Sequence, residues 1–511
     1  MRLLTSAAAI AAALILPAAA QAADAPVQVI LDASKPGAVI DRNIFGQFAE
    51  HLGSGIYGGI WVGKDSTIPN TRGIRNDVVT ALKALKVPNV RWPGGCFADQ
   101  YNWRRGIGPE RKPAVGEPNS FGTDEFMDFA QQIGTEAYIS VNLGSGTAQE
   151  AAEWFEYMTA PIDDFLGAER AKNGHPAPYK VAILGLGNES WDCGGAMSAD
   201  FYVNEMKRFS HFVNNYNSAQ PMKRVAVGPS STDPNYTDVV MKAWKGRSYS
   251  WDIDGLSLHF YATGGWPPHL PSTGFDEKDY AALVKDAIAM DDMIKTQSAI
   301  MDKYDPEKKV ALVVDEWGAW LAPTPGSNAG ALVQQNTQRD AVLAALSINV
   351  FARHADRVRM ANIAQMINVL QAMILTDKGK MLLTPTYHVF RMYVPFQDAT
   401  FVPLTFDAGA YTTNGITLPR VDAVAARDKA GKIWIAVTNI DARSPATFSV
   451  SLAGVKTMKA SGQTLSAPKV DSVNTFDAPN IVAPKALSAR VAGGKLTVTV
   501  APASVSVLGL E

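Results

Sequence analysis

The chain has 511 residues, of which 47% are hydrophobic and 19% are charged, a composition that excludes an intrinsically disordered protein. Its length exceeds what one compact core usually supports, so at least two domains are expected. The formal net charge of -2 excludes a strongly basic surface for nucleic acid and a strongly acidic surface alike.

The N-terminus has the features of a signal peptide. A positively charged start, Met1-Arg2, precedes an apolar, alanine-rich run over residues 3–20, and Ala20-Gln21-Ala22 matches the small-x-small pattern of a cleavage site. A transmembrane anchor is the alternative, but the run is marginal in length for a bilayer span and ends in the processing site. These features predict a signal peptide over residues 1–22 and a periplasmic or secreted protein without membrane contact after cleavage.

A regular alternation of strand and helix patterns follows. Residues 26–34 alternate like a half-exposed strand, and then apolar runs typical of buried parallel strands alternate with stretches of helical spacing. The predicted strands are 43–50, 87–92, 137–142, 181–186, 224–228, 253–259, 310–314 and 357–363. The predicted helices are 77–86, 124–132, 147–158, 199–215, 279–304 and 336–352. Eight strands, mostly separated by helices, predict an α/β chain with a (β/α)8 TIM barrel over residues 41–384.

An open, doubly wound sheet is the alternative arrangement of these elements. That fold usually carries a glycine-rich phosphate turn between an early strand and a helix. The glycine-containing segment RWPGGC, at residues 91–96, lacks the helix signature that should follow such a turn. The barrel is therefore the preferred fold.

The pattern changes from about residue 385. Short alternating segments at 433–439, 446–452 and 495–500 are separated by Gly, Ser, Thr and Pro. They predict a C-terminal antiparallel β-sandwich over residues 385–511. The strand pattern at 26–34 falls outside the barrel count, so residues 23–40 are expected to join this sandwich.

Two of the predicted barrel strands end in a glutamate. The run VAILGLGNES delivers Glu189, and KVALVVDEW delivers Glu316. An acid after a strand can simply begin a polar loop or cap a helix, but the carboxyl ends of barrel strands are also where catalytic groups meet. Two matching ends predict a pair of carboxylates, which is what cleavage of a glycosidic bond requires.

Other side chains at the predicted strand ends fit sugar binding. Hydrogen-bonding groups set among aromatic rings match a ring that carries hydroxyls and has apolar faces. Each residue has a structural alternative: Arg91 could be a surface charge, and His259 a hydrogen-bonded core histidine. Their shared position on one barrel face favours a sugar site. The residues are Arg91, Trp92, Asn102, Trp103, His259, Phe260, Tyr261 and Gln365.

Four segments, GNES, VVDEW, FAEHLGSGIYGGIWVG and RWPGGCFADQYNWRRGIGP, together resemble the α-L-arabinofuranosidases of glycoside hydrolase family 51. The resemblance covers residues 43–365 and implies a retaining enzyme with Glu189 as acid/base and Glu316 as nucleophile. It implies that the enzyme releases terminal non-reducing L-arabinofuranose from arabinan, arabinoxylan or derived oligosaccharides. It also implies sugar-binding positions at Glu50, Arg91, Cys96, Asn188, His259, Tyr261, Trp320 and Gln365.

The two cysteines, Cys96 and Cys193, allow either one disulfide or two buried thiols. Several family members have Asn where this chain has Cys96, whereas others combine GGCFAD with a cysteine shortly after the acid/base. This second pattern implies a Cys96–Cys193 disulfide beside the sugar pocket.

The implied mechanism needs opposite protonation states in the two glutamates. Glu316 should be ionised, helped by Arg91 and Tyr261, whereas burial and nearby negative charge should raise the pKa of Glu189. Retention places the two carboxyls roughly 5 Å apart. No metal or cofactor is expected, because the histidines lack a ligand spacing such as HExxH. The resemblance leaves room for a homo-oligomer.

Two rival functions are open at this point. A related retaining glycosidase, a β-xylosidase or endoglucanase, would keep the fold and change the sugar. A non-catalytic, sugar-binding barrel would be favoured if either glutamate were missing, and both are present.

Overall fold

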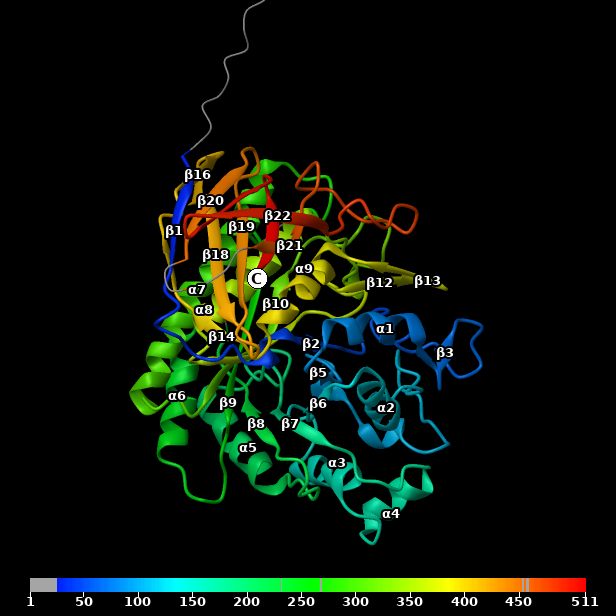
Figure 1. Cartoon of the computed structure of the whole chain (residues 1–511). Coiled ribbons are helices and arrows are strands. Elements are labelled where there is room, and N and C mark those ends of the chain that lie inside the picture. Colours follow the sequence, from blue (N-terminus) through cyan, green and yellow to red (C-terminus); the bar gives the residue numbers. More distant parts are fainter. Residues whose placement is uncertain (1–24, 231, 267–268, 453–454, 456–458) are drawn as a thin grey trace, which may run out of the picture.

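The computed structural model describes residues 25–511 except 231, 267–268, 453–454 and 456–458, so the predicted signal peptide lies outside the described residues. Eight parallel strands close into a barrel in the order β10-β11-β2-β5-β6-β7-β8-β9 (Figure 1). This confirms the predicted TIM barrel. Its strands are β2 (Gly46–Phe48), β5 (Asn89–Trp92), β6 (Glu136–Ser140), β7 (Val181–Leu186), β8 (Lys223–Ala226), β9 (Gly255–Ala262), β10 (Ala311–Ala319) and β11 (Val358–Ile363).

Helices follow the strands and cover the outside of the barrel. Strand β7 is buried at all six residues, because the barrel interior covers one face and helices cover the other. Two helices, α4 and α6, lie in segments where no helix was predicted. The helices are α1 (Asn76–Leu85), α2 (Thr123–Ile133), α3 (Ala148–Thr159), α4 (Phe165–Lys172), α5 (Ala199–Phe212), α6 (Pro234–Lys245), α7 (Glu277–Tyr304) and α8 (Gln338–Arg353).

The first barrel strand is shorter than the predicted strand at 43–50. A 3-10 helix, Arg42–Phe45, occupies its start, since the Asp41 carboxylate accepts a hydrogen bond from the Asn43 amide. Strand β2 then begins at Gly46, where a Cβ atom would lie 2.7 Å from Asn362 Nδ2. Only a glycine allows the neighbouring strands to approach this closely.

The C-terminal part is a ten-stranded sheet in the order β14-β18-β19-β24-β21-β22-β23-β20-β1-β15, which encloses a second apolar core. This confirms the predicted sandwich. Blue β1 lies beside orange β20 in Figure 1 and pairs with it in parallel, whereas the other pairs are antiparallel. The strands are β1 (Val27–Leu31), β14 (Thr400–Val402), β15 (Leu404–Phe406), β18 (Val421–Arg427), β19 (Ile433–Asn439), β20 (Ala446–Ser451), β21 (Ala460–Leu465), β22 (Lys485–Ala492), β23 (Lys495–Val500) and β24 (Ser504–Leu510).

The connection between barrel and sandwich is helical and buried. Residues after 384 form helix α9 (Pro385–Tyr393) and a 3-10 helix (Val394–Phe396) before the sandwich strands begin. The Gln338 amide at the start of α8 donates to the carbonyls of Leu465 and Ala503 in the sandwich. The ring of Trp317, next to Glu316 on β10, stacks on Phe390 of α9. Strand β10 is thus supported from the sandwich side.

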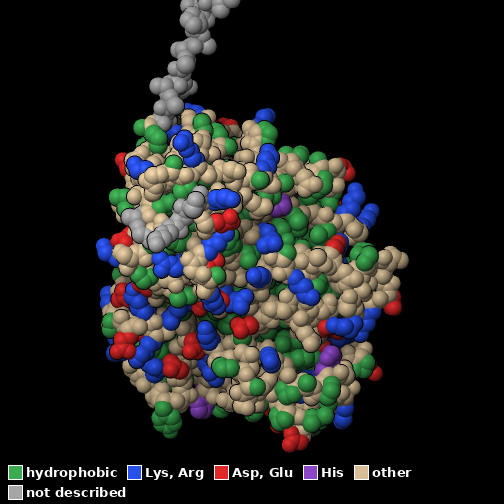
Figure 2. All heavy atoms as spheres, viewed as in Figure 1, with side chains coloured by type: hydrophobic (Ala, Val, Ile, Leu, Met, Phe, Trp, Pro, Cys, Tyr) green, Lys and Arg blue, Asp and Glu red, His purple; other side chains and the backbone are tan. Residues whose placement is uncertain are grey.

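Three short antiparallel strand pairs lie outside the barrel and the ten-stranded sheet in the described residues. They are β3 (Asn70–Thr71) with β4 (Ile74–Arg75), β12 (Ile374–Asp377) with β13 (Lys380–Leu383), and β16 (Ala410–Thr413) with β17 (Ile416–Pro419). Basic and acidic side chains are interspersed over the face shown in Figure 2. In the part of the chain that the structure describes, none of the helices has the length and apolar character that a bilayer crossing requires.

Candidate active site

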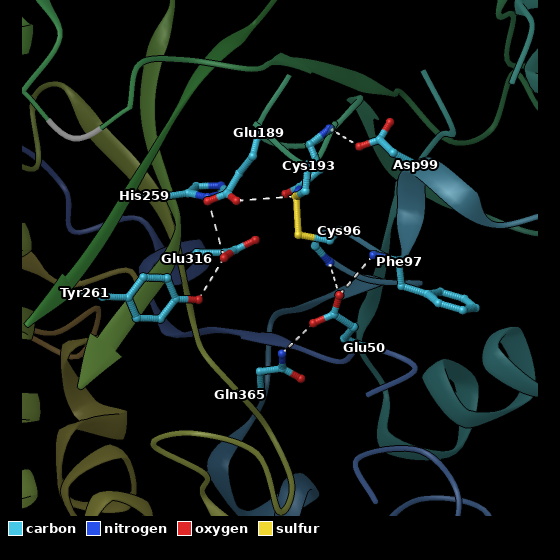
Figure 3. The surroundings of a disulfide bond; sticks show 12 residues. Glu50, Cys96, Phe97, Asp99, Glu189, Cys193, His259, Tyr261, Glu316 and Gln365 are labelled. Atoms are coloured by element: carbon cyan, nitrogen blue, oxygen red, sulfur yellow. Dashed lines mark hydrogen bonds and ion pairs between the residues drawn. A yellow bond between two sulfur atoms is a disulfide. The ribbon is translucent and has the colours of Figure 1, made fainter. Parts of the chain in front are cut away.

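Two glutamates from different strands meet at the carboxyl end of the barrel. Glu189 follows β7, Glu316 lies in β10, and Figure 3 shows both side chains facing one cavity with His259 beside them. An oxygen of each carboxylate and a ring nitrogen of His259 all lie within 4.8 Å of one another. The sequence runs that end in these acids therefore converge on one point.

Strand β10 brings two successive acids inward. Its pairing with β9 is irregular between Val313 and Glu316, and such an irregularity turns neighbouring side chains to the same face. Asp315 is 2% exposed and accepts hydrogen bonds from the Tyr138 and Ser257 hydroxyls. Although burial opposes ionisation, Arg91 and His259 hold the pKa of Asp315 below its usual range.

Arg91 connects the nucleophile candidate to the other strand. Its Nη1 donates to Glu316 Oε1 at 2.6 Å, and its Nη2 donates to Asn188 Oδ1 at 2.7 Å. Arg91 is 1% exposed, and the charges of Asp315 and Glu316 outweigh its burial and raise its pKa. A permanent positive charge therefore lies directly against the Glu316 carboxylate.

His259 contacts all three acids. Its Nδ1 lies 2.7 Å from Glu189 Oε1 and 3.5 Å from Glu316 Oε2, and its Nε2 lies 3.3 Å from Asp315 Oδ1. Burial lowers the pKa of this imidazole, but Glu316, Asp315 and Glu189 outweigh burial and raise it to about 10.

The prediction that the pKa of Glu189 is raised is wrong for the unliganded site. Burial does favour the neutral acid, but the hydrogen bond and positive charge of His259 are stronger together and lower the pKa of Glu189. The sequence placed His259 at the rim without indicating that its ring would touch Glu189. The proton of this pair therefore resides on the imidazole before substrate enters.

Tyr261 contacts both Glu316 and Trp320. The Tyr261 hydroxyl donates to Glu316 Oε2 at 2.7 Å, so both oxygens of Glu316 have a donor. The rings of Tyr261 and Trp320 meet edge to face with centroids 5.1 Å apart. The Trp320 side chain is half-buried.

In Figure 3, Glu50 lies across the site from Tyr261, and Gln365 lies next to Glu50. Glu50 Oε1 accepts from the amides of Gly95 and Phe97, and Oε2 accepts from Gln365 Nε2 at 2.8 Å. Burial and the charge of Glu316 raise the pKa of Glu50 to about 7. A Cβ atom at residue 95 would lie 3.0 Å from Glu316 Oε1, so Gly95 lets the backbone approach both carboxylates.

Cys96 and Cys193 form a disulfide that joins the loop after β5 to the loop after β7. Their Cα atoms are 5.5 Å apart, and Cys193 Sγ lies 3.6 Å from Glu189 Oε2. The bond thus borders the cavity, where it contacts the acid/base candidate from the side opposite His259 (Figure 3).

One rim residue proposed from the sequence, Trp103, is packed into the fold. Trp103 is 4% exposed, donates its indole N–H to the Glu150 carbonyl and stacks on Trp154, so it packs helix α3 against the loop after β5. Asn102 beside it is exposed. The sequence also missed Asp315 and Tyr138, although the adjacent acids in VVDEW and a tyrosine within an apolar strand were visible signals.

The grouping of Glu189, His259 and Glu316 has the ligand types that a divalent cation can use. Both oxygens of Glu316, however, already accept hydrogen bonds from Arg91 and Tyr261, and His259 Nδ1 is engaged with Glu189. A guanidinium in direct contact with the carboxylate opposes a second positive charge. The arrangement is better suited to nucleophilic and acid–base chemistry.

The chain matches two family models. Residues 81–266 match the α-L-arabinofuranosidase 1 domain, and residues 315–504 match the α-L-arabinofuranosidase C-terminal domain. A protein from Bacteroides ovatus, named intracellular exo-α-L-arabinofuranosidase, is 46% identical over 87% of this chain and 88% of its own length.

Solved structures agree with this likeness. The crystal structure of the GH51 arabinofuranosidase from Xanthomonas axonopodis pv. citri superposes with a TM-score of 0.92 and 49% identity, covering 95% of this chain and all of that one. The α-L-arabinofuranosidase from Thermotoga maritima, solved as an arabinose complex, superposes with a TM-score of 0.83 and 30% identity. The match covers 94% of this chain and 99% of that one.

The comparison corrects the predicted location. The periplasmic or secreted destination rested on residues 1–22, which lie outside the described residues, and the 46% identical relative is named an intracellular enzyme. An apolar, alanine-rich N-terminus is therefore not sufficient to assign export to this chain.

Proposed function

The chain belongs to the α-L-arabinofuranosidases of glycoside hydrolase family 51, and from this membership we propose that it releases terminal non-reducing L-arabinofuranose with retention of anomeric configuration. Arabinan, arabinoxylan and oligosaccharides derived from them are the proposed substrates. The observation that carries the proposal is the convergence of Glu189 and Glu316, with carboxylate oxygens within 4.8 Å of each other. Retaining glycosidases have carboxyl groups about 5 Å apart, and inverting enzymes need a wider gap for water.

In the first step Glu316 attacks the anomeric carbon. Arg91 and Tyr261 each donate a hydrogen bond to one of its oxygens and so fix the orientation of the carboxylate. Glu189 delivers a proton to the departing glycosidic oxygen, and a covalent glycosyl-enzyme forms. In the second step Glu189 removes a proton from water, which attacks the same carbon and releases arabinose.

Glu50, Asn188 and Gln365 are proposed to bind the arabinofuranose hydroxyls. Glu50 and Gln365 are joined by a hydrogen bond and face the cavity opposite Tyr261. Asn188 is held by Arg91, so its amide group is oriented beside Glu316. The Cys96–Cys193 disulfide and Trp320 are proposed to border the same sugar.

His259 is proposed to hold the proton that Glu189 needs. The imidazole and carboxylate are 2.7 Å apart and together retain one proton up to the pKa of His259, about 10. When a glycosidic oxygen approaches Glu189, the proton can pass across this hydrogen bond to the carboxylate. The reaction therefore starts from the singly protonated pair of Glu189 and His259, called the dyad below, and not from a simple carboxylic acid.

The proposed function is tested with a panel of 4-nitrophenyl glycosides and with NMR of the first-formed sugar. We expect hydrolysis of the α-L-arabinofuranoside to exceed that of the β-D-xylopyranoside and β-D-glucopyranoside, and the initial product to be the α-anomer. Preference for a pyranoside would contradict the assigned sugar, and a β-anomer formed first would contradict retention.

The dyad gives a pH-dependent prediction for the His259→Asn variant. In the wild-type protein the basic limb of the kcat/KM profile should lie near the raised pKa of His259, because the dyad keeps its proton below that value. Without the imidazole, Glu189 must hold the proton alone and loses it at a lower pH. We expect the basic limb to move down by at least about one pH unit. An unchanged limb would contradict the shared proton.

A further inference from the structure

A buried carboxylate close to the disulfide has no part in the chemistry described so far. Asp99 lies in a 3-10 helix, Ala98–Gln100, in the loop after β5 and is 2% exposed. Its Oδ1 accepts from the backbone amides of Leu143 at 3.0 Å and Gly144 at 2.7 Å. Its Oδ2 accepts from the backbone amide of Asn188 at 3.1 Å, the contact drawn beside Cys193 in Figure 3.

These three amides belong to two different strand ends. Leu143 and Gly144 follow β6, and Asn188 follows β7, so one side chain joins the ends of three successive barrel strands. The fit is tight: a Cβ atom on Gly144 would lie 2.8 Å from Asp99 Cβ, and one on Gly194 would lie 3.0 Å from Asp99 Oδ2. The carboxylate fills a space that the backbone encloses.

The turn that carries Glu189 depends on such external contacts. Gly187 has φ 92° and Glu189 has φ 34°, a left-handed conformation that is unfavourable for a residue with a side chain. Asn188, between them, is fixed from one side by Arg91 through its side chain and from the other by Asp99 through its amide. Both contacts therefore restrain the turn that positions Glu189.

We propose that Asp99 is a positioning residue for proton donation: it acts through the Asn188 amide to hold Glu189 in reach of the departing glycosidic oxygen. The inference rests on the proposed function and adds a residue to it. Asp99 does not touch the sugar, and its effect is confined to the proton transfers that Glu189 performs.

The Asp99→Asn variant breaks the relevant contact selectively. The amide oxygen of asparagine can still accept from Leu143 and Gly144, but its NH2 group then faces the Asn188 N–H, so two donors oppose each other. Burial raises the pKa of Asp99 to about 7 although three N–H groups favour the ionised form. Assays at about pH 8 therefore compare the variant with an ionised Asp99.

The test compares leaving groups. 4-Nitrophenolate departs without a proton, whereas the sugar leaving group of α-1,5-arabinobiose requires one, so kcat/KM for arabinobiose reports proton donation. We expect Asp99→Asn to lower kcat/KM at least about 30-fold on arabinobiose and less than about threefold on the nitrophenyl arabinofuranoside. Equal falls on both substrates would overturn the proposal, because a general structural defect does not distinguish leaving groups.

Asp305→Asn is the matched control at the other end of the barrel. Asp305 is also 2% exposed and accepts from the backbone amides of Lys309 and Val310, and it pairs with Arg357. We expect this variant to lower the thermal unfolding temperature without changing the ratio between the two substrates. A control with the same leaving-group selectivity as Asp99→Asn would also overturn the proposal.

If the Asp99→Asn variant does not fold, a second variant can be used for the same test. Asp99→Ala leaves room for water beside the three amides and should show the same selective loss on arabinobiose. If neither variant yields folded protein, Asp99 serves the fold and the positioning role is refuted. If the wild-type protein cleaves neither substrate, the proposed function fails; if it cleaves both and the variants lack selectivity, only this inference fails.

Discussion

Replacing Glu316 by Gln should lower kcat by at least about 10⁴-fold on every arabinofuranoside, including those with activated leaving groups. The amide has nearly the same shape as the carboxylate, but it cannot form the covalent intermediate. Arabinose binding should survive, because Glu50, Asn188 and Gln365 keep their places. Hydrolysis of the nitrophenyl arabinofuranoside measures the first effect, and isothermal titration calorimetry with L-arabinose measures the second.

Glu136→Gln supplies the control for this variant. Glu136 begins β6 at the opposite end of the barrel from the cavity and is exposed. Turnover of this control should match the wild-type protein within about twofold. If Glu316→Gln retained more than a small fraction of wild-type turnover after contamination was excluded, Glu316 would not be the nucleophile.

Glu189→Ala should separate the two steps of the reaction. Loss of the general acid should lower kcat/KM for arabinobiose by about 10²–10⁴-fold, with a much smaller loss for the nitrophenyl substrate. Because the general base is lost too, the glycosyl-enzyme should accumulate, which is visible as a burst of nitrophenol in stopped-flow measurements.

Azide gives this variant a sharper signature. A small anion can enter the space left by the Glu189 side chain and attack the glycosyl-enzyme without a base. Addition of azide should restore nitrophenol release and yield α-L-arabinofuranosyl azide, identified by NMR. A β-configured azide, or the same loss on both substrates with no rescue, would contradict the acid/base assignment.

The barrel could be predicted from the sequence because its strands are buried on both faces. The run at 181–186 is apolar at every position except Gly185, and the structure buries all of it. Glu189 and Glu316 stood out because each interrupts such a run at its carboxyl end. The sandwich was predicted for a related reason, since its strands alternate between a buried and an exposed face, as β23 does.

The contacts within the site could not be predicted in the same way. Strict alternation along β10 would point Asp315 and Glu316 to opposite faces, and only the irregular pairing in the folded sheet brings both inward. The lowered pKa of Glu189 depends on how the His259 ring, which projects from β9, is oriented toward the Glu189 carboxylate. Trp103 has the flat aromatic ring on which a sugar can stack, but packing against Trp154 buries it. These outcomes depend on tertiary distances that a residue pattern does not encode.

The position of β1 between β20 and β15 has a consequence for biosynthesis. Val29 pairs with Phe406, so its partner leaves the ribosome on the order of a minute after β1, at about 5–20 residues per second. During that interval the barrel residues emerge and can fold. The apolar side chains of Val29 and Leu31 stay exposed, because the strands that pair with β1 have not yet been synthesised. The sandwich is thus completed last, and the nascent chain carries an unpaired, aggregation-prone edge until translation is almost finished.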